Sequence, residues 1–448
     1  MKIEREITAY LKEWKKSPRR KPALVRGARQ IGKSWAIEEF GRNNYAHVAK
    51  FDFDEVPELA TVFKTTKEPA RIVKELALYV DVPILPGETL IIFDEIQECE
   101  EALNSLKYFN EKAPEYHIAA AGSLLGVAVK KKNMKVPVGQ LDIFDMYPIS
   151  FKEFLCAADP KTYAYAKGVD AIAHLPEIVM NKLTSEYRRY LICGGMPEAT
   201  VAMLEDLGTA AVDKILSDIL ALYELDFAKY ATPLEVVRIK AIWNSLPAQL
   251  SKENRKFIFN AIRSGARSKD YEDALTWLED AGIIYRIFNV SKPSIPLSGY
   301  SDAGAFKVYA CDTGLLRRLA RLDASVVANP VAGYTEFKGA MAENAILQSI
   351  MANPAIDKPY YWTSGNKAEV EFIISLGADI IPVEVKAENC VSGRSITVYE
   401  DKYHPSIRLR VSMLNLQMSG NLLSCPAPLF DWVTSLIHIT KKEYDSNI

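Results

Sequence analysis

Gly27-Ala28-Arg29-Gln30-Ile31-Gly32-Lys33-Ser34 is the stretch of the chain that decides its fold. It fits the pattern G-x-x-x-x-G-K-[ST] at every position, which is typical of a loop that binds the phosphates of a nucleotide. The glycines let backbone N–H groups turn inward, and the helix expected after the loop adds the positive end of its dipole. We expect Lys33 to contact the β- and γ-phosphates of ATP and the Ser34 hydroxyl to bind Mg²⁺. The expected nucleotide-binding residues run from Gly27 to Trp35.

The residues around this loop supply the context that it requires. Ala23 to Arg26 predicts a strand before the loop, and Trp35 to Phe40 predicts a helix after it. Further apolar runs of strand length stand at 46–53, 89–93 and 117–121, with helical stretches between them. Because strands buried on both faces are apolar throughout, this alternation predicts a parallel sheet with helical crossovers. The alternative, a glycine turn that binds nothing, is disfavoured by this context.

Two carboxylates follow the apolar run 89–93. Asp94 and Glu95 stand at the carboxyl end of the expected strand. There one acid can hold Mg²⁺ while the next orients and deprotonates the attacking water. We assign Asp94 to the metal and Glu95 to the water. Ser123, after the run 117–121, would lie beside the γ-phosphate if its strand lies between the other two, and capping the next helix is its alternative role. The expected catalytic residues are therefore Lys33, Glu95 and Ser123.

The composition limits the class of protein. A chain of 448 residues with 49% hydrophobic residues has more than one domain, because single cores stop growing at about 250–300 residues. A net charge of −2 gives no overall attraction to nucleic acid or to an anionic membrane. The six cysteines form no C-x-x-C pair and are expected to be free thiols in a reducing compartment. With no signal-peptide core and no apolar window of membrane-spanning length, we expect a cytoplasmic protein without membrane contact.

Four units are expected along the chain. Strand-like runs give way to helical periodicity between about 160 and 230, and helices followed by two β-like runs at 283–290 and 306–311 suggest a winged helix. A later helix leads into three further β-like runs. We therefore place an α/β core at 1–159, a helical lid at 160–235, a winged-helix-like segment at 236–325 and a second α/β unit at 326–448.

Five motifs together resemble a large prokaryotic family, usually described as an AAA-type ATPase domain followed by a C-terminal domain of unknown function. They are the loop 27–34, Phe93-Asp94-Glu95-Ile96-Gln97, Ala121-Gly122-Ser123, Tyr147-Pro148-Ile149-Ser150-Phe151-Lys152-Glu153-Phe154 and Gly194-Gly195-Met196-Pro197. The resemblance covers nearly the whole chain, and the motifs occur in the family's order. It implies an ATPase core, a helical lid, a winged-helix segment and a nuclease-like C-terminal fold. It supplies no known substrate.

The last unit contains a second candidate site. Glu384 and Lys386 are two residues apart on an expected strand, so both side chains leave the same face. With Glu371 on the preceding strand and Glu343 on the helix before it, they resemble the PD-(D/E)xK nuclease pattern, in which carboxylates hold a divalent metal. The family more often has aspartate at the position of Glu371. The alternative is a nuclease-derived fold that no longer cuts.

Basic residues precede the helix expected at 270–281. They are Lys252, Arg255, Lys256, Arg263, Arg267 and Lys269, and such residues can meet DNA phosphates. Because Glu253, Asp270, Glu272 and Asp273 lie among them, a solvated face or a contact with a protein is an equally good interpretation.

The expected fold class is α/β, with a P-loop NTPase sheet of the AAA type and a helical lid, followed by a winged-helix segment and a nuclease-like domain. The expected function is Mg²⁺-dependent hydrolysis of ATP that drives a conformational switch, with DNA or a protein as partner. The alternative is a non-enzymatic, nucleotide-gated interaction module. The intact set of Lys33, Asp94 and Glu95 favours hydrolysis.

Overall fold

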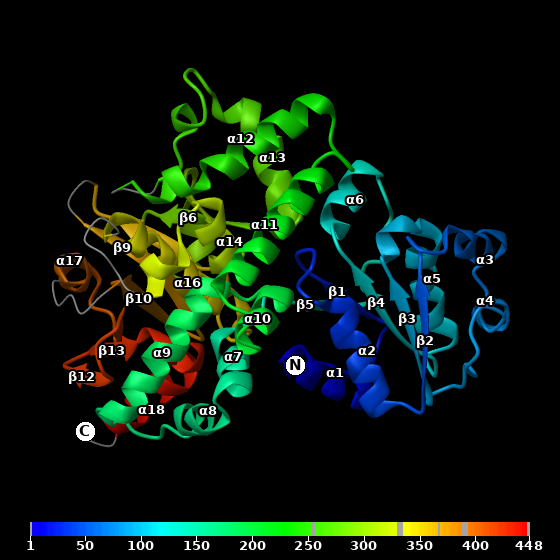
Figure 1. Cartoon of the computed structure of the whole chain (residues 1–448), viewed down its shortest axis with the longest axis horizontal. Helices are drawn as coiled ribbons and strands as arrows, with labels where there is room; N and C mark the ends of the chain where they lie inside the picture. Colours follow the sequence, from blue (N-terminus) through cyan, green and yellow to red (C-terminus); the bar gives the residue numbers. More distant parts are fainter. Residues whose placement is uncertain (1, 253–255, 329–334, 366–367, 388–392, 446–448) are drawn as a thin grey trace.

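The computed structural model describes residues 2–252, 256–328, 335–365, 368–387 and 393–445. Within them, two β-sheets organise the chain, and Figure 1 shows them on opposite sides of the molecule. None of the helices in these ranges is long and apolar enough to cross a membrane.

The first sheet is entirely parallel and has the strand order β2-β3-β4-β1-β5. Its strands are β1 (Ala23–Arg26), β2 (His47–Asp52), β3 (Thr89–Asp94), β4 (His117–Gly122) and β5 (Asp142–Asp145). Strand β4 lies between β1 and β3, which is the order of the additional-strand P-loop ATPases. The carboxyl ends of β1, β3 and β4 therefore meet at one edge of the sheet, and this edge carries the phosphate loop.

Helices cover both faces of this sheet because successive residues of a buried strand point to opposite sides. Ile92 packs in the core formed with α1 (Ile7–Lys16) and α2 (Lys33–Asn44). Its neighbours Ile91 and Phe93 pack on the other face, in the core that α3 (Ala60–Thr65), α4 (Pro69–Leu76) and α5 (Glu100–Lys112) complete. The apolar runs that predicted these strands are thus explained by burial on both sides.

A helical region follows the first sheet. Its helices are α7 (Phe151–Ala158), α8 (Pro160–Lys167), α9 (Glu177–Cys193), α10 (Pro197–Leu204), α11 (Thr209–Asp226), α12 (Pro233–Leu250) and α13 (Ser268–Asp280), whereas α6 (Leu125–Lys131) connects β4 to β5 within the first sheet. Two begin with capping boxes, Ser150 with Glu153 for α7 and Thr232 with Glu235 for α12, so side chains satisfy the first free N–H groups of each helix. The helical stretch expected from 160 to 230 is confirmed.

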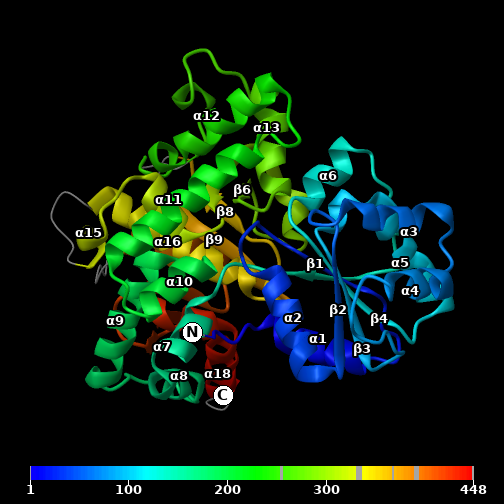
Figure 2. The ribbon, with the colours of Figure 1, turned by 45° about the vertical axis from the view of Figure 1, so that its right-hand side comes forward.

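The second sheet is mixed and has the order β12-β13-β11-β10-β9-β8-β6-β7. Its strands are β6 (Ile284–Val290), β7 (Ser301–Ala310), β8 (Tyr360–Thr363), β9 (Glu369–Leu376), β10 (Asp379–Val385), β11 (Arg408–Ser412), β12 (Gln417–Ser419) and β13 (Leu422–Pro426). The helices around it are α14 (Thr313–Leu319), α15 (Ala324–Ala328), α16 (Thr335–Ala352), α17 (Arg394–Tyr403) and α18 (Val433–Asp445), and Figure 2 shows α16 beside this sheet. Asn289 of β6 pairs with Tyr361 of β8.

The β6–β7 hairpin therefore belongs to the same sheet as the C-terminal strands. The hairpin expected after α13 is confirmed, whereas the winged-helix assignment and the four domain boundaries stay predictions. One continuous hydrophobic core runs from α1 through the helical region into the second sheet. Short 3₁₀ turns occur at η1 (Pro57–Leu59), η2 (Ile96–Glu98), η3 (Phe259–Ala261), η4 (Leu297–Tyr300) and η6 (Ala427–Trp432).

Candidate functional site

The phosphate loop connects β1 to α2, and its backbone needs both glycines. A Cβ atom at Gly27 would lie 2.2 Å from the carbonyl oxygen of Met146, so no side chain fits there. Gly32 has a φ of 86°, in the left-handed region that favours glycine. The close approach at Gly27 comes from Met146, the residue directly after β5, which runs beside β1. The loop is thus shaped by the neighbouring strand as well as by its own sequence.

Lys33 lies inside the loop. Its Nζ donates to the carbonyl oxygens of Gly27 at 3.1 Å and Ala28 at 2.7 Å, and the residue is only 6% exposed. Burial lowers the pKa of Lys33 to about 8, although Glu95 and Asp94 act in the opposite direction. A buried ammonium without a full counter-charge is a strong site for an anion.

Ser34 and Asp94 stand together as a candidate Mg²⁺ site. The Ser34 hydroxyl donates to Asp94 Oδ1 at 2.8 Å, and Lys50 Nζ lies 3.0 Å from Asp94 Oδ2. Hydroxyl and carboxylate oxygens are the ligands that Mg²⁺ prefers, and the ion usually adds water and substrate phosphates. The residues present therefore fit a magnesium ion carried by ATP. Lys50 escaped the sequence analysis because nothing local shows that β2 lies beside β3.

Glu95 follows β3 with a φ of 47°, which turns its side chain towards the end of β4. Its Oε2 accepts a hydrogen bond from the Ser123 hydroxyl at 2.7 Å and another from the side-chain amide of Gln97. The alternative role for Ser123, capping the next helix, is not found, because α6 begins after Leu124 and has no side-chain cap. The structure thus brings Ser123 to the carboxylate assigned to the attacking water.

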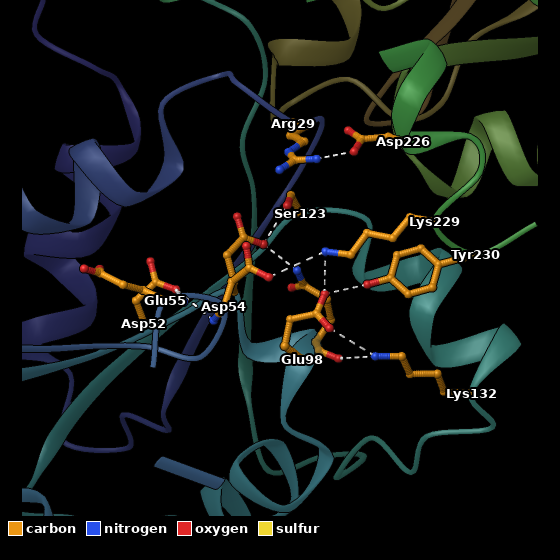
Figure 3. Close-up of polar contacts among 12 residues, drawn as sticks. Arg29, Asp52, Asp54, Glu55, Glu98, Ser123, Lys132, Asp226, Lys229 and Tyr230 are labelled. Atoms are coloured by element: carbon orange, nitrogen blue, oxygen red, sulfur yellow. Dashed lines mark hydrogen bonds and ion pairs between the residues drawn. The ribbon is translucent and has the colours of Figure 1, made fainter. Parts of the chain in front are cut away.

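The last turn of α11 and the segment after it close over this edge of the sheet (Figure 3). The Tyr223 hydroxyl donates to the carbonyl oxygen of Arg29 at 2.8 Å, and the Arg29 side chain forms an ion pair with Asp226. Lys229 and Tyr230 contact Glu98, three residues after Glu95. Sequence reasoning missed these contacts because about 200 residues separate Arg29 from its partners on α11.

A cavity of about 550 Å³ borders the phosphate loop at Gly27 and Ala28. Its other walls come from β5, α6, and the region from α13 to β6. At Gly282 a Cβ atom would lie 3.2 Å from the backbone nitrogen of Ala28. The hairpin region thus contacts the phosphate loop directly.

The second candidate site lies on β9 and β10. Glu384 is 1% exposed and forms ion pairs with Arg410 and Lys386, each at 3.3 Å. Burial raises the pKa of Glu371, with Lys386 and Lys307 opposing and Glu384 reinforcing the shift. Glu371, Glu384 and Lys386 are therefore brought together.

The expected convergence of three carboxylates is not found. Glu343 accepts a hydrogen bond from the Tyr309 hydroxyl at 3.0 Å. Within the described ranges, no three histidine, cysteine, aspartate or glutamate side chains are placed to hold a metal ion. Arg410 and Lys386 instead supply to Glu384 the positive charge that a metal would supply. A divalent metal at Glu343, Glu371, Glu384 and Lys386 stays a prediction.

Replacing Glu384 by alanine is expected to lower the free energy of unfolding by about 3–5 kcal/mol, because Arg410 would keep a buried, uncompensated charge. Urea unfolding of both proteins measures this. Lys441→Ala is the matched control, since it removes a partner from the more exposed ion pair with Asp379 on the same strand. Equal losses in the two variants would contradict the structural role of Glu384. If Mn²⁺ stabilises the unaltered protein and Lys441→Ala but not Glu384→Ala, the result would support a metal site at Glu384.

The basic residues near α13 are described only in part. Arg255 and its neighbour Glu253 lie outside the described residues. Lys256, Arg263, Arg267 and Lys269 are exposed, and Lys252 is partly buried. Glu272 forms an ion pair with Arg286 of β6. DNA contact at this surface stays a prediction.

Comparison with known families identifies the first unit. The model of a family described as an AAA domain matches residues 19–155. The chain carries an AAA domain. Two further models match domains of unknown function, DUF8612 at residues 184–326 and DUF4143 at residues 338–428. The AAA domain contains the phosphate loop, Asp94, Glu95 and Ser123, and the order of its sheet is that of P-loop ATPases.

Solved structures resemble the chain only distantly. A Walker-type ATPase of Pyrococcus abyssi has 15% identity and a TM-score of 0.44, over 71% of this chain and 96% of that one. The ORC2 protein of Aeropyrum pernix, in ADPNP–ADP complexes, has 14% identity and a TM-score of 0.35, over 74% and 89% of the two chains. A search of curated proteins gives no match. At these scores the structural likeness adds nothing to the AAA-domain match.

Proposed function

We propose that this protein binds ATP with Mg²⁺ and hydrolyses it, and that hydrolysis drives a conformational switch. The observation that carries the proposal is the meeting of three groups at the carboxyl ends of adjacent strands. Lys33 fills the phosphate loop, Ser34 donates to Asp94, and Ser123 donates to Glu95. These are the parts that phosphoryl transfer to water requires.

Each group has a role that follows from its position. Lys33 would exchange its bonds to the loop carbonyls for bonds to the β- and γ-phosphates. Ser34 and Asp94 would hold Mg²⁺, which supplies charge stabilisation to the phosphates when bound. Glu95 would take a proton from the attacking water, while Ser123 fixes the direction of its carboxylate. The groups proposed for the reaction thus all lie within the AAA domain.

Turnover of ATP with and without DNA tests the proposal. Release of phosphate that requires Mg²⁺ supports hydrolysis, and stimulation by DNA would identify nucleic acid as the partner. Tight binding of ATP without turnover would instead favour the second candidate, a nucleotide-gated protein-interaction module. That candidate is favoured by the contacts of α11 and the β6–β7 region with the phosphate loop, because nucleotide binding would alter them.

The affinity for ATP is expected to fall as the pH rises above 8. Lys33 needs its charge to bind phosphates, and burial lowers its pKa to about 8 in the absence of nucleotide. Above that pH the lysine must take up a proton on binding, so the affinity falls by up to about tenfold per pH unit. Calorimetry between pH 7 and pH 9, in buffers of different ionisation enthalpy, measures both the affinity and the proton uptake.

The stability of the nucleotide-free protein should change in the opposite direction. The unfolded lysine keeps its proton up to its ordinary pKa of 10.5, whereas the folded one loses it near 8. The unfolded state therefore binds more protons in this window, and the Lys33 contribution to the free energy of unfolding rises with pH. For the affinity prediction above, an ATP affinity that stays constant from pH 7 to pH 9 would contradict the assignment of Lys33 as the lysine that contacts the phosphates.

A further inference from the structure

Arg29 and Asp226 form an ion pair at the mouth of the phosphate loop (Figure 3). Arg29 is the third residue of the loop, and its side chain is 37% exposed. Asp226 ends α11, its side chain is 11% exposed, and its Oδ2 has no hydrogen-bond partner among the described residues. A nearly buried carboxylate thus faces the phosphate loop, and one arginine of that loop provides its side-chain partner.

A second contact joins the same turn of α11 to the same residue of the loop. The Tyr223 hydroxyl donates to the carbonyl oxygen of Arg29 at 2.8 Å, and Tyr223 is 2% exposed. The negative charges of Glu95 and Asp54 also act on Arg29. The guanidinium therefore lies in the acidic field at the catalytic end of the site, where the terminal phosphate of a nucleotide would arrive.

We propose that Asp226 and the terminal phosphate of ATP compete for Arg29. Without nucleotide, Asp226 holds the guanidinium in the way that a phosphate would. Bound ATP attracts Arg29, because a phosphate carries more charge than a carboxylate and can accept two parallel hydrogen bonds from a guanidinium, whereas Asp226 accepts through Oδ1 only. The buried Asp226 is then repelled by the nucleotide. This inference rests on the proposed ATP binding and names the residues that would sense the third phosphate.

The packing of α11 carries this exchange to α12 and α13. Phe227, next to Asp226, is fully buried, and its ring centroid lies 6.4 Å from that of Trp243 on α12 and 5.4 Å from that of Trp277 on α13. A shift of Asp226 therefore acts directly on both helices. Close packing transmits such shifts because the interior has little free volume.

The attachment through Glu98 would stay in place and serve as a pivot. Lys229 Nζ lies 2.9 Å from Glu98, and the Tyr230 hydroxyl donates to Glu98 at 2.6 Å. Lys132 of the segment after α6 contacts the same carboxylate at 3.3 Å. ATP would thus release the Arg29–Asp226 attachment, while the contacts with Glu98 and the Tyr223 hydrogen bond stay in place. Ion pairs from α6 to α12 and α13, Lys131–Glu235 and Lys130–Asp280, limit how far these two helices can move.

The affinities for ATP and ADP in an Asp226→Asn variant test the competition. The variant is expected to bind ATP on the order of fivefold more tightly, since the phosphate no longer has to displace a carboxylate. ADP, which lacks the third phosphate, is expected to gain much less. Asp54→Asn is the matched control, because it removes one negative charge that acts on Arg29 and leaves the Arg29–Asp226 ion pair intact. It also weakens the 3.8 Å ion pair of Asp54 with Lys229. It should shift both affinities by the same small factor.

Arg29→Gln supplies the second arm. Glutamine can still donate a hydrogen bond to Asp226, but that nearly buried carboxylate loses its cation, so urea unfolding first checks that the variant is folded. The variant is expected to lower the ratio of ATP affinity to ADP affinity. When Asp226→Asn is added to Arg29→Gln, it should no longer raise the affinity for ATP relative to ADP, since no arginine is left for Asp226 to bind. An unchanged ratio in Asp226→Asn and in Arg29→Gln would overturn the competition. Failure of the unaltered protein to bind ATP would instead contradict the proposed function. Failure of the competition and failure of ATP binding can therefore be told apart.

Discussion

The Lys33→Ala variant is expected to bind ATP at least on the order of a hundredfold more weakly than the unaltered protein. Hydrogen bonds to a charged group are each worth about 1.5–3 kcal/mol, and 1.4 kcal/mol corresponds to a factor of ten. Lys33 is the lysine of the phosphate loop, and its Nζ already lies among the loop carbonyls. Titration with a fluorescent ATP analogue measures the loss directly.

This loss should not reflect unfolding. Lys33 is 6% exposed and pays a burial cost that the lowered pKa records, so alanine removes an unfavourable buried charge as well as two hydrogen bonds. We expect the free energy of unfolding to change little. Lys64→Ala, at an exposed lysine of α3 in the same domain, is the control and should bind ATP normally. Equal affinities in the two variants would remove Lys33 from the nucleotide site.

The AAA domain could be predicted closely because its signals are local. The loop motif, each apolar run of β1 to β4 and the acidic pair at the end of β3 can each be recognised from a few consecutive residues. Strand β5 was not predicted, since its four residues alternate between partly buried and exposed positions and form no apolar run. Yet β5 brings Met146 against Gly27. A functional constraint on the loop thus came from a strand without a sequence signal.

The residues that surround the site were harder to find because they depend on adjacency between distant segments. Lys50 reaches Asp94 only because β2 lies beside β3. Arg410 reaches Glu384 because β11 runs parallel to β10, with these two residues in register. The sequence pattern E-x-K placed Glu384 on a strand correctly, whereas Lys386 lies directly after the end of β10. The pattern carried no information about a cation on the next strand. The metal site expected at these carboxylates therefore stays a prediction.

Glu95 is the group whose role depends most on its direction. Its φ of 47° is uncommon for a residue other than glycine, and the Ser123 hydroxyl holds its Oε2 at 2.7 Å. A left-handed residue directly after a strand stores conformational strain, and such strain persists where the surrounding structure fixes it. The carboxylate is therefore held at the end of β3, one residue beyond the proposed magnesium ligand Asp94.

The Glu95→Gln variant is expected to bind ATP normally and to hydrolyse it about 10²–10⁴-fold more slowly. The amide has the size of the carboxylate and can accept the Ser123 hydrogen bond, but it cannot take a proton from water, and a positioned general base contributes a factor of this size. Single-turnover hydrolysis, measured with nucleotide affinity on the same preparation, separates the two effects. Asp54→Asn, which removes a nearby negative charge, should retain most of the turnover. Glu95→Gln turnover equal to that of the unaltered protein would move the base to another residue, whereas loss of ATP binding would make Glu95 a part of the nucleotide-binding structure.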